Sequence, residues 1–281
     1  MAKLTRYLCL VATTQAEIGV IGGSGFYSLL TDAQTVPVST PFGEPSDPLT
    51  IGTLAGRRVA FLPRHGADHR FPPHRVPYRA NLWALASVGV RQVVTGSAVG
   101  SFKPELGPGS LVLPDQLLDR TWGRPQTFND ADTGVAHVSF ADPYCPTGRA
   151  AAIRAAAATG TELADGGTLL VVNGPRFSTR AESREFQATG ASIIGMTAMP
   201  ETVLARELAL CFTSLCLVTD LDAGVEAGEG VTHAEVLRMF AANLPRMRDL
   251  LIATLAELPE QQSGCDCGQA LDGITVPYPL P

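Results

Sequence analysis

Short apolar runs rich in Val, Ile and Leu alternate along the chain with longer amphipathic segments, and this alternation restricts the fold more than any other feature. Apolar runs bounded by turn residues are typical of buried strands, whereas apolar residues that recur every three to four positions indicate helices. We therefore predict an α/β fold, a single-domain mixed sheet flanked by helices, in which unequal connection lengths leave room for antiparallel strands. The predicted strands are 17–22, 57–62, 92–95, 110–113, 168–172 and 215–219, and the predicted helices are 76–87, 147–159, 201–209 and 234–258.

The sequence Thr232-His233-Ala234-Glu235 has the pattern of a capping box. In this motif the threonine hydroxyl and the glutamate carboxylate each accept a hydrogen bond from the other residue's free backbone amide. It predicts that the last helix begins near His233.

No low-complexity linker divides the 281 residues, which favours one domain over two. We predict an N-terminal extension at 1–16, one domain at 17–258 and a C-terminal tail at 259–281. The tail ends in Pro277-Tyr278-Pro279-Leu280-Pro281, which cannot form a helix. It is expected to be an extended segment packed on the body or across a subunit boundary, with a disordered tail as the alternative.

The chain is 45% hydrophobic and only 17% charged, which suggests a large core and some surface covered by other subunits. Its net charge is −6 and it has no block of lysine or arginine, so nucleic acid is an unfavoured partner. Residues 1–16 are too polar and too short for a signal peptide, and we expect neither a membrane anchor nor export. The sequence therefore predicts a cytoplasmic oligomer.

Six cysteines are present, and four of them (Cys9, Cys145, Cys211 and Cys216) are scattered through apolar sequence. These four are interpreted as small buried hydrophobic residues. Cys265 and Cys267 differ because one residue separates them, which is not the spacing of a zinc knuckle. They are either an unremarkable part of the tail or a strained, reducible pair.

Three small-residue segments follow predicted strands and are candidates for an anion site. Gly22-Gly23-Ser24-Gly25 follows the first strand, Pro63-Arg64-His65-Gly66 the second, and the segment from Thr95 to Ser101 runs on from the third. Glycine turns expose backbone amides, and an arginine fork beside an imidazole can hold phosphate. Each segment alone is equally consistent with a tight turn or a surface loop. Because ligands of α/β sheets bind where strand ends converge, the three together favour an anion site.

Two later segments are candidates for binding a flat base. Phe177 lies in Asn173-Gly174-Pro175-Arg176-Phe177-Ser178, and Met196 follows a further short helix. Either side chain could line an apolar slot, although core packing is the competing interpretation for each. Asp220 and Asp222 end the last strand and, being two residues apart, can present two carboxyls to one ligand. A metal site is less favoured there, because no third ligand follows at a suitable spacing.

In this order the segments resemble the 5'-methylthioadenosine phosphorylases of the trimeric purine nucleoside phosphorylase family. The resemblance spans roughly residues 18–258. Its motifs are Gly22-Gly23-Ser24-Gly25, Thr40-Pro41-Phe42-Gly43-Glu44-Pro45-Ser46-Asp47, Arg64-His65-Gly66, Asp119-Arg120-Thr121, Arg124-Pro125-Gln126, Gly174-Pro175-Arg176-Phe177-Ser178 and Thr219-Asp220-Leu221-Asp222.

The resemblance implies a homotrimer of single-domain subunits that acts on a purine nucleoside with inorganic phosphate as co-substrate and needs no metal or organic cofactor. It implies phosphate binding by Ser24, Arg64, His65, Ser97, Ala98 and Thr197. It implies substrate binding by Phe177, Ser178, Met196, Asp220, Asp222, His233 and Val236, with His137 lent to the neighbouring subunit's pocket.

The expected chemistry is cleavage of the glycosidic bond by phosphate. Two positive groups in the phosphate site would hold the nucleophile below C1', and a protonated Asp220 would donate to N7 of the purine. Asp222 would accept from the 6-amino group. Two carboxyls in one apolar pocket raise each other's proton affinity, so that one stays protonated near neutral pH.

Three alternatives stay open at this point. One is a 6-oxopurine nucleoside phosphorylase, which acts on inosine or methylthioinosine. Such an enzyme would need an amide side chain to bind the base, whereas this chain has Asp220 and Asp222 with Ser178. A hydrolytic nucleosidase is less favoured, because Ser24, Arg64 and His65 would have no phosphate to hold. A non-catalytic nucleoside-binding protein would keep the base pocket and release no base.

One position departs from the family pattern. His233 stands where the methylthio pocket of this family has a small apolar residue. A 5'-hydroxyl is stabilised by a hydrogen bond, whereas a methylthio group is stabilised by contact with apolar side chains. We therefore expect adenosine or 2'-deoxyadenosine to be used about as well as methylthioadenosine, unless His233 turns to solvent.

Overall fold

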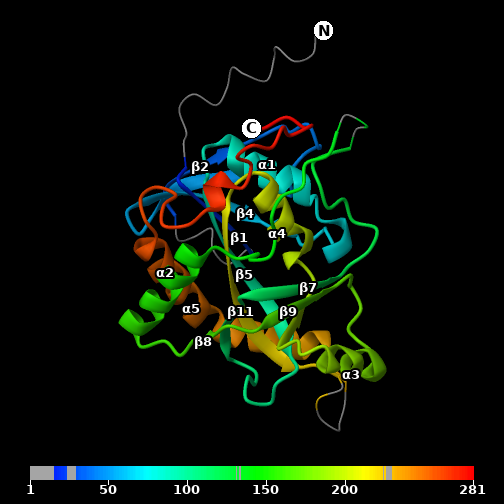
Figure 1. Cartoon of the computed structure of the whole chain (residues 1–281). Coiled ribbons are helices and arrows are strands. Elements are labelled where there is room, and N and C mark those ends of the chain that lie inside the picture. The colour runs from blue at the N-terminus through cyan, green and yellow to red at the C-terminus, as the bar shows by residue number, and fades with distance from the viewer. Residues whose placement is uncertain (1–15, 24–29, 131, 133, 224, 226–229) are drawn as a thin grey trace.

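The computed structural model describes residues 16–23, 30–130, 132, 134–223, 225 and 230–281. Ile18–Gly22 (β1), Arg57–Pro63 (β4), Gln92–Ser101 (β5) and Cys211–Leu221 (β11) form the centre of a mixed sheet (Figure 1). Eight of its eleven described strands run in the order β2-β3-β4-β1-β5-β10-β9-β7. Off this path, β11 joins β5 to β6, and β6 pairs with β8. The other strands are Thr31–Val36 (β2), Leu49–Leu54 (β3), Leu111–Leu113 (β6), Gln116–Arg120 (β7), Ala164–Asp165 (β8), Thr168–Val172 (β9) and Ile193–Gly195 (β10). The prediction of a mixed sheet is confirmed.

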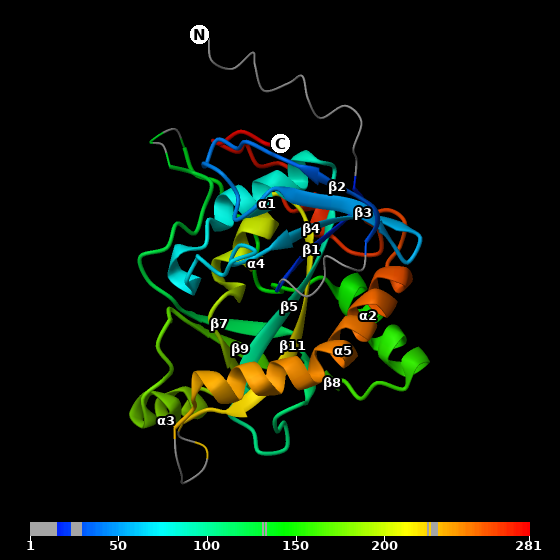
Figure 2. The same ribbon diagram turned by 180° about the vertical axis from the view of Figure 1, so that it is seen from behind.

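Helices cover both faces of this sheet (Figure 2). Tyr78–Ser87 (α1) and Ala198–Glu207 (α4) pack on one face, where Leu82 and Leu204 are fully buried. Pro146–Thr159 (α2) and His233–Glu257 (α5) pack together on the other, where Ala152 and Leu251 are fully buried. Alanines on α2 permit this close approach. The remaining helices are Arg180–Ala188 (α3) and two short 3-10 helices, Pro73–Arg75 (η2) and Cys267–Gln269 (η3).

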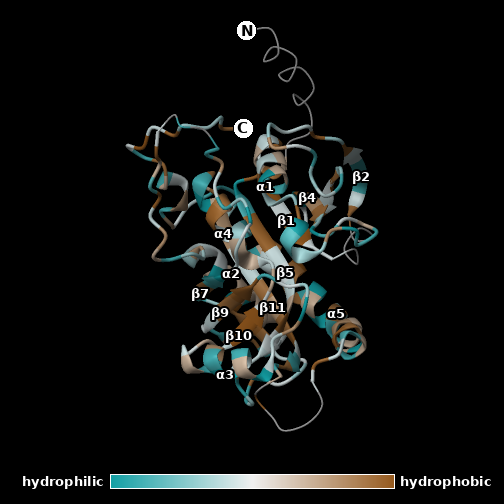
Figure 3. Cartoon of the chain, turned by 90° about the vertical axis from the view of Figure 1, so that its right-hand side faces the viewer, coloured by the Kyte–Doolittle hydropathy of each residue, from teal (hydrophilic) through white to brown (hydrophobic). Residues whose placement is uncertain are grey.

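Strands β5 and β11 are longer than predicted. The segment after Thr95 was expected to leave the sheet as a small-residue turn, but it continues as strand to Ser101. β5 pairs with β11 in parallel along this part, and its end also pairs with β10. The neighbouring strands accept hydrogen bonds from the backbone amides of this part of β5. Its small residues therefore allow the strands to pack closely and do not form a turn. Apolar residues gather on these central strands (Figure 3).

Among the strands that were not predicted, β2 lacks the apolar signal, and β8 and β10 are too short to give one. Every residue of β2 is at least partly exposed, and β8 and β10 are two and three residues long. Pairing with a neighbouring strand, and not local sequence, holds such segments in the sheet.

The last helix begins at His233, as predicted, but the cap is only half of the expected box. The Thr232 hydroxyl accepts from the Glu235 amide at 3.3 Å. The Glu235 carboxylate accepts from the Thr232 hydroxyl at 2.6 Å, in place of the expected amide. A complete capping box occurs instead at α3, where Thr179 and Glu182 satisfy each other's amides.

The C-terminal tail lies against the body and is less extended than expected. It contains η3, and its Tyr278 is buried beside Phe128 with ring centroids 5.8 Å apart. The Tyr278 hydroxyl donates to the Glu207 carbonyl at 2.9 Å. Among the described helices, none is both long and apolar enough to cross a membrane.

Candidate active site

Three of the predicted anion-binding segments come from adjacent strands. β1 pairs in parallel with both β4 and β5, which places the ends of β1 and β4 beside Thr95, in the middle of β5. The Arg64 amide donates to the Gly22 carbonyl at 3.1 Å, and the Arg64 guanidinium donates to the Gly96 carbonyl at 3.0 Å. The three segments therefore lie side by side, although the third belongs to a continuing strand and not to a strand end. Ser24 lies outside the described residues.

The Arg64 side chain is held by the carboxylate of Glu201, a residue for which the sequence predicted no role. Glu201, in α4, accepts from Nε of Arg64 at 2.5 Å and from Nη2 at 3.0 Å. Both side chains are almost fully buried. Although burial alone would lower it, the Glu201 carboxylate raises the pKa of Arg64 above its usual value. With the Gly96 contact, three of the five N–H groups of the guanidinium are used, and two are left for a ligand.

His65 is neutral near pH 7. Burial, together with the positive charge of Arg64, lowers its pKa to about 4. Nδ1 of His65 lies 2.8 Å from the Phe71 carbonyl, which only accepts, so Nδ1 carries the proton and Nε2 presents a lone pair. The site therefore has one positive group in these two residues instead of the two expected. A neutral His65 can accept a hydrogen bond from a protonated phosphate oxygen.

The remaining residues expected to bind phosphate come from β5 and α4. Ser97 is half-buried and Ala98 exposed, both within β5. Thr197 is buried at the N-cap of α4, one turn before Glu201. The threonine hydroxyl makes no cap hydrogen bond. Met199 has non-helical backbone angles, so the regular part of α4 begins at Pro200, which has no backbone N–H.

An irregularity in the pairing of β11 with β5 sets the position of the Asp220 carboxyl. The pairing of β11 with β5 shifts between Val218 and Asp220, which places Asp220 opposite Gly100. A Cβ at Gly100 would lie 2.9 Å from the carboxyl oxygen, so glycine is needed there. The bulge and the glycine together make room for the carboxyl at the edge of the sheet. The Thr219 hydroxyl donates to Asp220 at 2.8 Å.

Both carboxyls of the pair have raised pKa values. Burial raises the pKa of Asp220 to about 6, and the charge of Asp222 adds to this rise. Burial also raises the pKa of Asp222, whereas hydrogen bonds from Ser183 and Ser178 lower it. Oδ2 of Asp222 is buried and has no hydrogen-bond partner within the described part of the chain. The pair thus offers one carboxyl that protonates readily and one acceptor oxygen that is free.

Phe177 and Met196 lie half-buried in loops that the fold brings close to each other. Gly174 has a φ of +61°, and a Cβ there would lie 2.5 Å from the sulfur of Met196. The glycine therefore lets the loop before Phe177 pack on Met196. This contact fits the expected apolar wall for a base.

A cavity of about 240 Å³ opens beside Asp220. Its wall includes Val231 and Glu235, from either side of the start of α5. His233 is exposed and Val236 half-buried, and neither lines this cavity. The buried pocket expected around His233 is therefore not formed by the described residues of a single chain. His137 is also exposed.

Comparison with known proteins agrees with this geometry. A model of the phosphorylase superfamily matches residues 17–256. The chain belongs to the phosphorylase superfamily. A purine nucleoside phosphorylase of Streptomyces coelicolor is 60% identical over 275 residues, which are 95% of this chain and 98% of that protein.

Two further members of the superfamily are similar over nearly the whole chain. An S-methyl-5'-thioadenosine phosphorylase of Mycolicibacterium smegmatis is 53% identical over 265 residues, or 94% of this chain and 99% of that protein. The crystal structure of a methylthioadenosine phosphorylase from an antarctic soil metagenomic library is 41% identical, with a TM-score of 0.88. It covers 94% of this chain and 93% of its own.

In this member of the superfamily, Arg124 ties the loops of the site together. It is 7% exposed and reaches four partners from separate segments. It donates to the carbonyls of Met196 at 2.9 Å, Met199 at 2.5 Å and Asn173 at 2.7 Å, and to the Tyr78 hydroxyl at 3.3 Å. The sequence motif containing Arg124 was recognised, but its role was not, because the partners lie far away along the chain.

Replacing Arg124 by lysine should destabilise the protein and misplace Met196. A lysine offers a single ammonium, which cannot reach all of these carbonyls, and each buried acceptor left alone costs about 1–3 kcal/mol. We expect the free energy of unfolding to fall by at least about 2 kcal/mol and kcat/KM to fall about tenfold. Urea unfolding and initial rates measure the two effects.

Arg79→Lys is the matched control. Arg79 lies in α1 and pairs with Asp130, whose side chain is 65% exposed. Exposed pairs contribute at most about 1 kcal/mol, so this variant should be close to the unmodified protein. Equal losses in the two variants would contradict a positioning role for Arg124.

Proposed function

We propose that this protein cleaves the glycosidic bond of 5'-methylthioadenosine, and of adenosine, with inorganic phosphate. The products are adenine and the corresponding ribose 1-phosphate. The observation that carries this proposal is the carboxyl pair: Asp220, whose pKa is raised to about 6, beside Asp222, whose Oδ2 is buried without a partner among the described residues.

This pair suits the edge of adenine. N7 of a purine accepts a hydrogen bond, which protonated Asp220 can donate, and the 6-amino group donates to an acceptor such as Asp222. A 6-oxopurine presents an acceptor at this position, which would face the free oxygen of Asp222 and repel it. The pair therefore favours the 6-amino nucleosides over inosine.

The phosphate side supports the same reaction. Two free N–H groups of Arg64 hold the anion, and neutral His65 accepts from its protonated oxygen. Phosphate attacks C1' from the face opposite the base, which inverts the anomeric carbon and gives an α-ribose 1-phosphate. Donation to N7 by Asp220 lets the base leave nearly neutral. Phosphate is a co-substrate, and the proposed reaction uses no metal or organic cofactor.

A substrate panel tests the specificity. Initial rates with methylthioadenosine, adenosine and inosine at saturating phosphate should rank the two adenine nucleosides far above inosine. A kcat/KM for inosine equal to that for adenosine would favour the 6-oxopurine alternative.

His233 is proposed to set the preference at the 5' position. It lies between Val231 and Glu235, which line the cavity beside Asp220. His233→Val should raise the ratio of kcat/KM for methylthioadenosine to that for adenosine by about tenfold, because valine removes a hydrogen bond to the 5'-hydroxyl and offers an apolar wall to the methylthio group. Ala234→Val puts the same side chain on another side of the helix and should leave this ratio unchanged. No change with His233→Val would mean that His233 does not contact the 5' group.

We also propose a cytoplasmic homotrimer with sites near the subunit boundaries. Trp122 is 74% and Val135 70% exposed in the single chain, and large apolar side chains are commonly covered by partner subunits. Val135 lies two residues from His137, the residue proposed to enter the neighbouring pocket. Free thiols fit a reducing compartment.

A further inference from the structure

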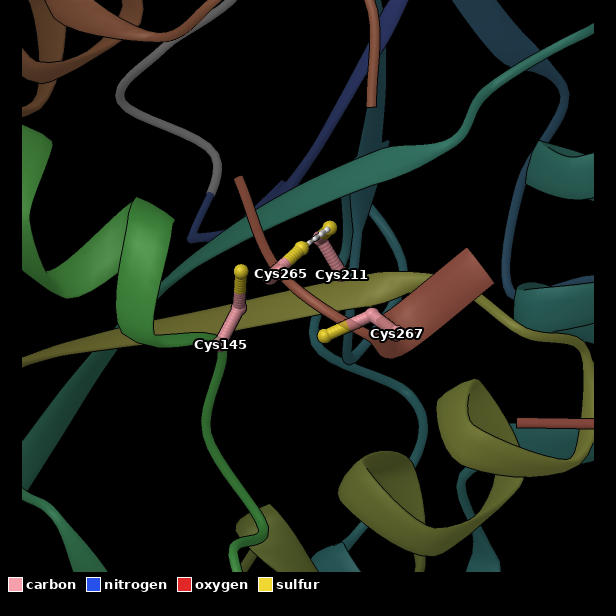
Figure 4. A group of neighbouring side chains, drawn as sticks. All are labelled: Cys145, Cys211, Cys265 and Cys267. Carbon is pink, nitrogen blue, oxygen red and sulfur yellow. Dashed lines mark hydrogen bonds between the residues drawn. The ribbon is translucent and has the colours of Figure 1, made fainter. Parts of the chain in front are cut away.

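Four cysteines from three distant segments meet at the start of β11, at the opposite end of this strand from Asp220 (Figure 4). Cys145 is the N-cap of α2, Cys211 begins β11, and Cys265 and Cys267 belong to the tail. Their four sulfur atoms all lie within 4.8 Å of one another, and those of Cys211 and Cys265 are 3.5 Å apart. Cys145 and Cys211 were expected to be isolated buried residues; they are buried, but they are not isolated. Cys9 lies outside the described residues.

The surroundings of this cluster favour negative charge on sulfur. The Gly148 amide, in the first turn of α2, donates to the Cys145 sulfur at 3.4 Å. The side-chain amide of Gln262 donates to the Cys211 sulfur at 3.4 Å. Such N–H···S contacts are the outer contacts that metal thiolate sites use.

We propose that Cys145, Cys211, Cys265 and Cys267 bind one Zn²⁺ ion in a structural tetrathiolate site. Four sulfurs placed tetrahedrally at about 2.3 Å from zinc are about 3.8 Å from one another. The sulfurs of the cluster lie within 4.8 Å of one another and one pair is 3.5 Å apart, so side-chain rotations can bring all four to a zinc ion. A set of four sulfur ligands suits zinc or iron and excludes calcium and magnesium.

The arrangement of the four thiols favours one shared ion over two disulfides. Every sulfur has the other three within 4.8 Å, whereas disulfides would group them as two separate pairs. None of the five described cysteines is bonded to another. Cys265 is half-buried and the other three are buried, so the site is closed except for one side through which an ion can enter.

Zinc binding exchanges protons and involves no redox step. Zn²⁺ and four thiols give a tetrathiolate with two negative charges and release four protons to solvent. The positive end of α2 and the Gln262 amide offset this charge.

The ion would fasten the tail to the body. Cys265 and Cys267 lie between two other tail contacts: Gln262 donates to the Ala209 carbonyl at 2.8 Å, and Tyr278 donates to the Glu207 carbonyl. Thr147, next to the start of α2, donates to the Ser263 carbonyl at 3.2 Å. Zinc would add bonds from the tail to α2 and β11, so its removal should loosen residues 259–281 before the core.

Metal content tests this proposal without any reference to activity. The full-length protein is reduced, stripped with a chelator, loaded with Zn²⁺ and freed of unbound metal, and zinc is then measured by elemental analysis. We expect one zinc per chain. Cys145→Ser and Cys267→Ser should each reduce the retained zinc at least tenfold. Cys216→Ser is the matched control, because Cys216 is fully buried in the same strand as Cys211 but outside the cluster.

Measurements on the unmodified protein keep the test valid if a serine variant fails to fold. Co²⁺ in place of zinc should give intense thiolate-to-metal absorption bands, and Zn²⁺ should protect four thiols from a thiol reagent and raise the melting temperature. Retention of less than about a tenth of a zinc per chain by the reduced protein would overturn the proposal. So would iron in place of zinc in protein purified from cells, or an intact mass showing disulfides among these cysteines under reducing purification.

Discussion

Replacing Asp220 by asparagine should lower kcat/KM for methylthioadenosine and adenosine by about 10²- to 10⁴-fold, the usual contribution of a general acid. Asparagine keeps the shape of the side chain but has no acidic proton to give to N7. It can still donate a weak hydrogen bond, which suits N7 and O6 of a 6-oxopurine. Inosine should therefore be tolerated or favoured by this variant, and it serves as an internal control for folding.

The pH profile should depend on the same carboxyl. With a pKa near 6, Asp220 is protonated below pH 6 and loses its proton as the pH rises through this value. About one molecule in ten is still protonated at pH 7. In the unmodified protein, kcat/KM should fall as the pH rises through about 6, and this limb should be absent in Asp220→Asn. Normal adenosine turnover by the variant, or an unchanged limb, would remove Asp220 from the mechanism.

Glu201→Gln should lower the free energy of unfolding by about 3–5 kcal/mol, because it leaves the Arg64 charge buried without its carboxylate. Both partners are almost fully buried, so water cannot replace the lost contact. Urea unfolding measures the change. Added phosphate should raise the melting temperature of the variant more than that of the unmodified protein, because the anion then pairs with Arg64.

Glu207→Gln is the matched control for this measurement. Glu207 lies in the same helix and is 5% exposed, but it accepts from the Phe128 amide at 2.8 Å instead of pairing with a guanidinium. A glutamine can keep that hydrogen bond, so a loss of only about 1 kcal/mol is expected. If the free energy of unfolding falls by the same amount in the two variants, the buried Arg64–Glu201 pair does not stabilise the protein more than an ordinary buried hydrogen bond does.

The sequence allowed the central strands to be predicted because they are buried on both faces and therefore continuously apolar. Strands such as β2 could not be predicted, because their residues are exposed and only pairing with β3 holds them. The ends of β5 and β11 were also missed. Gly96 and Gly100 resemble turn residues locally, and only the pairing with β11 and the position of Asp220 explain them.

The same limit applies to the site. Arg64, His65 and the two aspartates could be named as candidates because each lies at or just after the end of a strand, where ligands of α/β sheets bind. Glu201 and Arg124 were not given roles, because their partners are distant in sequence and buried pairing leaves no local signal. The cysteine cluster was missed for the same reason: its four members come from three segments, and only the folded chain brings them together.

The most direct test of the proposed reaction is the release of adenine from methylthioadenosine with and without phosphate. With phosphate, we expect adenine and an equal amount of 5-methylthioribose 1-phosphate. In an inert buffer without phosphate, adenine release should fall to background. Adenine release at the same rate in both buffers would show a hydrolase, and no release in either would show a binding protein; each of these results would contradict phosphorolysis.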